Sequence, residues 1–166
     1  MTTLMFLHVL TGTLAVLAGF TALFTKKGQI THRAAGNLFF GTMLLMGISG
    51  SIIAFQITQT ITFIAGLYTC YLVATAWRTV KTAPKSRSIL DVFGFVFVLG
   101  IAAFAFYSGM QANSSPDGKL DGFGAGPYYF FAVLALLAAC LDALYLYKHG
   151  HKGKHRIARH VWRMCF

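Results

Sequence analysis

The amino-acid sequence predicts an all-α protein, a polytopic transmembrane helix bundle with five helices and the start of a truncated sixth. Its composition is the first reason. Of the 166 residues, 57% are hydrophobic and only 11% are charged, whereas about 25% of the residues of a soluble domain are charged. The second reason is that the apolar residues gather in five runs. Each run is long enough to cross a hydrocarbon core of about 30 Å as a helix.

The five runs are expected to be helices because only helices and closed barrels satisfy their own backbone hydrogen bonds in lipid. Barrel strands would alternate in polarity over about ten residues, and these runs do not alternate. No proline falls inside any run. Within a single transmembrane domain, residues 1–166, the expected helices in chain order are 4–24, 34–55, 61–77, 89–110 and 128–147.

The basic residues predict the orientation of this bundle. Three lie in the connection 25–33, four in 78–88 and six in the C-terminal segment 148–163, whereas the two remaining connections hold only Lys119. Because cytoplasmic loops are enriched in Lys and Arg, we expect the three basic segments in the cytoplasm and the N-terminus outside. The net charge of +10 then reflects topology, and we expect no nucleic-acid partner.

Two further features concern packing and the chain end. Small residues in the first run form a stripe at helical spacing, Gly12, Ala15, Gly19 and Ala22. Such stripes let helix backbones approach closely in lipid, so we expect a seam between the first two helices, with a homo-oligomer face as the alternative. After the expected basic tail 148–163, Trp162–Phe166 is expected to open a sixth helix that is cut short.

Histidines are the candidate ligands for a cofactor. His8 lies inside the first run, and an ionisable group at membrane depth is a functional candidate by default. Its other interpretation is a neutral side chain bonded to a neighbouring helix. His32 and His160 lie near the opposite face of the membrane. We therefore take His8, His32 and His160 as candidate haem or metal ligands, with haem b as the candidate cofactor; no other metal site is expected.

A set of charged residues is predicted to meet near the cytoplasmic ends of the helices. Asp142 lies inside the fifth run, where a lone carboxylate should pair with a cation or be protonated. The predicted ion-pair belt contains Arg33, Asp91, Asp142, Arg159 and Arg163. The alternative is a cytoplasmic-side pocket for an anionic headgroup, a quinone or a haem propionate.

Three short motifs carry a resemblance to a known family. Leu7-His8-x-x-x-Gly12, His32-Arg33-x-x-Gly36 and Arg159-His160-x-x-Arg163-Met164 resemble the signature of a family of bacterial multi-pass membrane proteins of unknown function. The resemblance covers nearly the whole chain. It implies a helix bundle in the bacterial inner membrane, a chain that continues into a further helix, and kinship with haem-binding four-helix cytochromes. Asn37 stands where the family often has Arg, which argues against a phosphate-binding role there.

No Ser-His-Asp, HExxH or Walker signature is present, so we expect no catalysis. The leading hypothesis is an inner-membrane protein that binds membrane lipid or a hydrophobic small molecule. The alternative is a b-type haem or quinone-linked redox protein. A transporter or sensor subunit is a further alternative, although a transporter would need helices broken by polar gaps at the midplane, and residues there such as Met46 and Leu72 are apolar.

Overall fold

The computed structural model describes residues 2–83 and 86–166, and these residues confirm the all-α class. The elements in chain order are α1 (Thr3–Phe24), α2 (Ile30–Gln56), α3 (Thr60–Lys81), α4 (Ile89–Ser114), β1 (Lys119–Leu120), β2 (Phe123–Gly124), α5 (Ala125–Tyr147) and α6 (Gly153–Cys165). The helices α1 to α5 are each long and apolar enough to cross a membrane. The two strands form a small antiparallel hairpin between α4 and α5.

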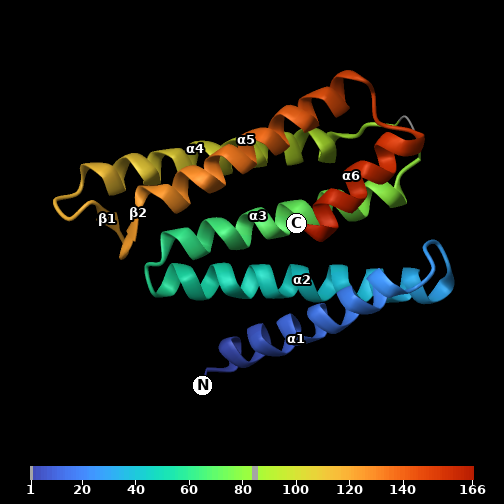
Figure 1. Ribbon diagram of the computed structural model, residues 1–166, viewed down its shortest axis with the longest axis horizontal. Helices are drawn as coiled ribbons and strands as arrows, with labels where there is room; N and C mark the ends of the chain where they lie inside the picture. The colour runs from blue at the N-terminus through green and yellow to red at the C-terminus, as the bar shows by residue number, and fades with distance from the viewer. Residues whose placement is uncertain (1, 84–85) are drawn as a thin grey trace.

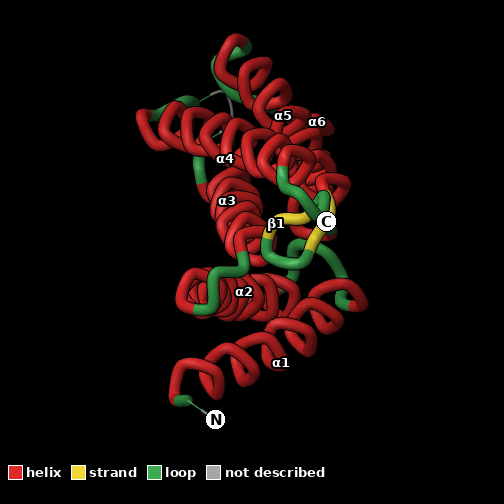
Figure 2. The backbone as a smooth tube through the Cα atoms, turned by 90° about the vertical axis from the view of Figure 1, so that its left-hand side faces the viewer, coloured by secondary structure: helices red, strands yellow, loops and turns green. Residues whose placement is uncertain are grey.

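The five long helices form a slab rather than a ring. In Figure 2, α1, α2 and α3 follow one another in a row, with α4 and α5 beyond α3. Helix α1 packs mainly against α2, whereas α3 contacts α2, α4, α5 and α6. Figure 1 shows the α1–α2 and α5–α6 connections at one end of the slab and the α2–α3 connection and the hairpin at the other. Helix α3 is therefore the centre of the molecule.

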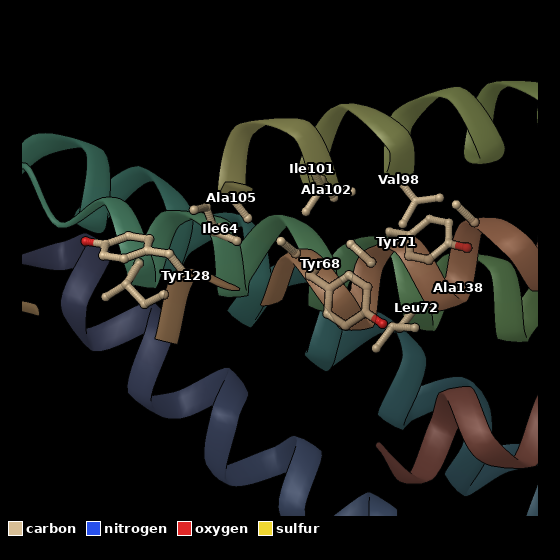
Figure 3. Packing of buried hydrophobic residues seen from close by; sticks show 14 of the residues in the cluster. Ile64, Tyr68, Tyr71, Leu72, Val98, Ile101, Ala102, Ala105, Tyr128 and Ala138 are labelled. Atoms are coloured by element: carbon tan, nitrogen blue, oxygen red, sulfur yellow. The ribbon is translucent and has the colours of Figure 1, made fainter. Parts of the chain in front are cut away.

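The hydrophobic core lies where α3, α4 and α5 meet. Ile64, Val98 and Ala105 are fully buried there, and Tyr128 is buried at the end of the core that is next to the β1–β2 hairpin (Figure 3). Alanines on α5, such as Ala135, allow a close approach of the helices. At the hairpin end, the hydroxyl of Tyr128 donates to the carbonyl of Leu120.

The predicted seam between the first two helices has a clear structural basis. A Cβ atom added at Gly12 would lie 3.3 Å from the sulfur of Met46, and one added at Gly19 would lie 3.1 Å from the ring of Phe39. Both glycines of α1 thus face large side chains of α2. Small residues opposite large ones are the pattern expected for helices that associate by packing in lipid.

Several helices extend past their apolar runs. Helix α2 begins at Ile30, four residues before the predicted start, and α4 continues to Ser114. At the start of α4, Ser88 and Asp91 form a reciprocal capping box, which satisfies free backbone N–H groups. Hydropathy marks the part of a helix that lies in lipid, whereas caps of this kind set where the helix begins.

The C-terminal segment differs from the prediction. It was expected to be a basic tail up to residue 163 with a helix opening near Trp162, but α6 begins at Gly153 and runs back along α3 (Figure 1). The physical reason is the spacing of its polar residues, Arg156, Arg159, His160 and Arg163, which places them on one helical face. That face is turned into the protein.

Candidate functional site

The buried polar face of α6 meets α3 along antiparallel helices. Arg163 of α6 contacts Thr75 of α3, and Arg159, one turn earlier on α6, contacts Thr79, one turn later on α3. In each pair a guanidinium Nη1 donates to the threonine Oγ1. The two threonine hydroxyls donate in turn to backbone carbonyls of α3. The result is one arginine–threonine arrangement repeated at i, i+4 spacing on both helices.

Asp142 of α5 joins both arginines at the centre of the site. Its Oδ1 accepts hydrogen bonds from Arg159 Nη2 at 2.8 Å and from Arg163 Nη2 at 2.6 Å. Its Oδ2 accepts a hydrogen bond from the Tyr71 hydroxyl at 2.6 Å. The exposed fractions are 1% for Asp142, 1% for Arg163 and 6% for Arg159. We call Tyr71, Thr75, Thr79, Asp142, Arg159 and Arg163 the arginine cluster.

Aromatic rings enclose the two guanidinium groups. The Arg159 guanidinium carbon lies 4.0 Å from the centroid of the Tyr145 ring, and that of Arg163 lies 5.1 Å from Tyr71 and 5.2 Å from Trp162. A cation over an aromatic face is attracted by the ring quadrupole, by about 2 kcal/mol when the pair is desolvated. The rings therefore offset part of the cost of holding two cations away from water.

The cluster nevertheless holds more positive than negative charge. Two guanidinium groups face one carboxylate, and the Nε atoms of Arg159 and Arg163 have no hydrogen-bond partner among the residues that the structure describes. Buried charged groups normally have their donors satisfied. An acceptor for these two N–H groups is therefore missing from residues 2–83 and 86–166.

The charged and titratable neighbours do not change this balance. Arg156 donates to the carbonyls of Thr79, Val80 and Thr82, so its charge sits at the negative end of the α3 dipole. In the α5–α6 connection, burial and the positive charge of Arg159 lower the pKa of His151, which favours its neutral form.

The remaining acidic residues of the chain are bound elsewhere. The sequence has four, all aspartates. Asp91 forms an ion pair with Arg78 at 3.3 Å, Asp121 accepts hydrogen bonds from Thr60, and Asp117 accepts one from Ser115. Among the described residues, Asp142 is therefore the only carboxylate that forms an ion pair with either cluster arginine.

The predicted belt is divided into separate groups. Asp142 binds Arg159 and Arg163, Asp91 binds Arg78, and Arg33 belongs to neither group. The Nε of Arg33 donates instead to the carbonyl of Gly28 at 2.8 Å, because its side chain folds back over the connection that precedes α2. The sequence predicts that these residues lie at the same depth in the membrane. Depth alone does not decide which helix faces contact each other.

The three candidate haem or metal ligands are each bonded to the backbone of the protein. Each engages a backbone carbonyl of a neighbouring helix through Nδ1: His8 with Met46 at 3.1 Å, His32 with Ala22 at 3.0 Å and His160 with Ala76 at 3.1 Å. Ala22 is fourteen residues along α1 from His8, or about 21 Å at the rise of an α-helix. His8 and His32 therefore cannot share a metal ion.

No group of three or more His, Cys, Asp or Glu side chains in the described parts of the chain could hold a metal ion. Two apolar hollows of about 310 and 350 Å³ share Phe63 and Leu67, on a different face of α3 from the arginine cluster. Neither hollow is lined by a histidine. Since His8 and His32 cannot share an iron and neither hollow is lined by a histidine, the arginine cluster is the stronger candidate site.

Sequence reasoning missed the α3 side of the site. Tyr71 and Thr75 lie within the expected helix 61–77 and Thr79 lies in the connection 78–88, and none of them is among the candidate residues predicted from the sequence. Their spacing of four residues places them on one face of α3, and this polar stripe was the signal that could have found them. The same helical periodicity in residues 156–163 would have identified the buried face of α6.

Comparisons of the chain with protein-family models, with curated proteins and with solved structures found no match.

Proposed function

We propose that this protein is a bacterial inner-membrane protein that binds a lipid or a hydrophobic small molecule through a polar group held at the arginine cluster. The observation that carries the proposal is the pair of buried Nε–H groups on Arg159 and Arg163 without an acceptor among the described residues. A pocket that orients a ligand needs a few well-placed polar groups. The arginine cluster has them, whereas the two apolar hollows are lined almost wholly by hydrocarbon.

An amphiphile is the class of ligand that suits the surroundings of this cluster. Helix α6 exposes Ile157 and Val161 on the face away from α3, which is favourable in lipid. Because Arg159 and Arg163 are 6% and 1% exposed, the head of an amphiphile would contact the guanidinium groups only after a displacement of α6, while its hydrocarbon chain would stay in the bilayer. A small hydrophilic ion would have to leave water completely to reach the same place.

We further propose that the ligand reaches the cluster from the cytoplasm. Basic residues are enriched in the α1–α2, α3–α4 and α5–α6 connections, and such connections are usually cytoplasmic. The α5–α6 connection leads directly to the cluster. Toward the other side, Tyr68 and Phe166 contact one another edge to face, and the apolar core follows. This arrangement favours holding a ligand over passing it across the membrane.

The test is the amount of amphiphile that the purified protein retains. Wild-type protein, Arg163→Gln and Arg33→Gln would be extracted in mild detergent, and their bound lipids would be identified by native mass spectrometry. Arg33→Gln is the matched control, since within residues 2–83 and 86–166 the Arg33 side chain bonds only the carbonyl of Gly28 in the preceding connection. We expect wild type and the control to retain ligand and Arg163→Gln to lose it.

Size-exclusion profiles would establish that each variant is folded. Arg159→Lys is a second variant. It keeps the positive charge of the cluster but lacks the Nε–H and the planar guanidinium group of arginine, so we expect it to retain less ligand. Equal retention by wild type and by folded Arg163→Gln and Arg159→Lys would contradict the proposed function.

A further inference from the structure

We propose that the ligand of the arginine cluster has a head with a single negative charge, borne by a carboxylate or phosphodiester oxyanion. This inference rests on the proposed function and specifies its ligand class. It separates monoanionic amphiphiles from neutral ones, such as quinones and alcohols, and from phosphomonoesters with two charges.

The charge of the buried groups is the first step. Arg159 and Arg163 contribute two positive charges and Asp142 one negative charge, which leaves one positive charge in a site whose three members are each at least nine-tenths buried. Interactions between charges are strong where the dielectric constant is low. One negative charge balances the site, whereas a neutral head leaves it positive and a doubly charged head makes it negative.

The arrangement of donors is the second step. On each arginine, Nη1 donates to a threonine and Nη2 donates to Asp142, so the Nε–H is the donor left over. The two arginines lie at i, i+4 on one face of α6, and within the described residues each has this one unpaired donor. Oxyanions are the acceptors that guanidinium groups bind most strongly, through short charge-assisted hydrogen bonds.

The polar neighbours of the cluster are bound to other groups. Arg156 is engaged by three carbonyls at the end of α3. His160 on α6 is bonded to the carbonyl of Ala76. The hydroxyl of Tyr71 donates a hydrogen bond to Asp142. The count of one surplus positive charge refers to the three buried charged groups, Asp142, Arg159 and Arg163; Arg156 is a further cation at the half-buried edge of the cluster.

The experiment measures binding of four probes to the purified full-length chain in detergent at pH 8. The probes are palmitate, dipalmitoyl phosphatidylglycerol, hexadecanol and dipalmitoyl phosphatidate, which provide a carboxylate, a phosphodiester, a neutral head and a largely dianionic phosphomonoester. We expect the two monoanions to bind at least about tenfold more tightly than the other two, a difference of about 1.4 kcal/mol. Palmitate and phosphatidylglycerol distinguish a free fatty acid from a phospholipid as the source of the shared oxyanion.

Two variants change the surplus charge in opposite directions. Asp142→Asn raises it to two, so phosphatidate should become the preferred probe. Arg163→Gln lowers it to zero, so the preference for monoanions should disappear. Asp117→Asn, in the exposed connection at the other end of the bundle, is the control and should leave the wild-type order unchanged. If Asp142→Asn does not fold, the loss of preference in Arg163→Gln still tests the inference.

The failures of the two proposals are distinguishable. Binding of hexadecanol or phosphatidate to wild type as tightly as the monoanions would overturn the charge assignment and leave an amphiphile-binding protein. An unchanged probe order in folded Arg163→Gln would overturn it as well. Binding of none of the four probes would overturn both this inference and the proposed function.

Discussion

Asp142 is the residue on which the position of α6 depends most. It is 1% exposed and accepts hydrogen bonds from both cluster arginines, so its loss would leave two cations without a counterion. Removal of one partner from a buried ion pair costs about 3–5 kcal/mol. We expect Asp142→Asn to lower the free energy of unfolding by an amount in this range.

Thermal denaturation in detergent, followed by tryptophan fluorescence, would measure the effect. Trp162 is on α6 and lies against Arg163, so its signal reports the displacement of that helix. Asp117→Asn removes a carboxylate that is exposed to solvent and should leave the melting temperature almost unchanged. A melting curve for Asp142→Asn that coincides with that of wild type would show that the ion pairs contribute no net stability.

At this scale the sequence identifies charged residues better than their neutral partners. Asp142, Arg159 and Arg163 stand out because a membrane segment rarely contains ionisable groups, and the structure joins all three. Thr75 and Thr79 do not stand out, because a threonine in a transmembrane helix can bond its own backbone. Arg33 was assigned to the same group by its depth, and depth carries no information on the direction in which the side chain turns.

Helices α2 and α3 approach each other closely around Gly47 and Gly66. A Cβ atom added at Gly66 would collide with Ser51 Oγ and would lie 2.9 Å from the carbonyl oxygen of Gly47. Because the latter is a backbone atom, the two helices would have to separate. We expect Gly66→Ala to destabilise the protein by about 1–3 kcal/mol, as is usual for overpacking.

Gly41→Ala is a matched control for this substitution, since a Cβ atom at Gly41 would meet nothing within 4 Å. Unfolding followed by fluorescence in increasing denaturant would compare the two variants under the same conditions. We expect Gly41→Ala to match or slightly exceed wild type, because alanine is a better helix former than glycine. Equal stability of the two variants would mean that α2 and α3 are packed less closely than the structure has them.

The sequence predicted the most hydrophobic helices best and the polar helix α6 worst. All five apolar runs became helices, since a long apolar segment has few other stable structures in lipid. Their ends were less certain, because caps such as Ser88 with Asp91 depend on single side chains. Helix α6 was the least predictable element: its polar face is turned inward, and a hydropathy profile reads such a helix as an exposed tail.

The orientation of the whole molecule decides which compartment would supply the proposed ligand. The charge distribution predicts the α1–α2 connection in the cytoplasm and the far end of α4 outside, and these positions lie at opposite ends of the slab (Figure 1). Single cysteines can test both positions in a chain whose own cysteines, Cys70, Cys140 and Cys165, have been replaced by alanine. Gln29→Cys and Asn113→Cys are suitable because neither changes the charge that sets the orientation.

We expect a membrane-impermeant maleimide to label Asn113→Cys in intact spheroplasts, and to label Gln29→Cys only after the membrane has been opened. Both residues are exposed, so access to the reagent depends on the side of the membrane. The reverse pattern would place the α5–α6 connection and the arginine cluster toward the outer surface. The ligand would then have to come from the outer leaflet, although the charge balance of Asp142, Arg159 and Arg163 would still require a monoanion.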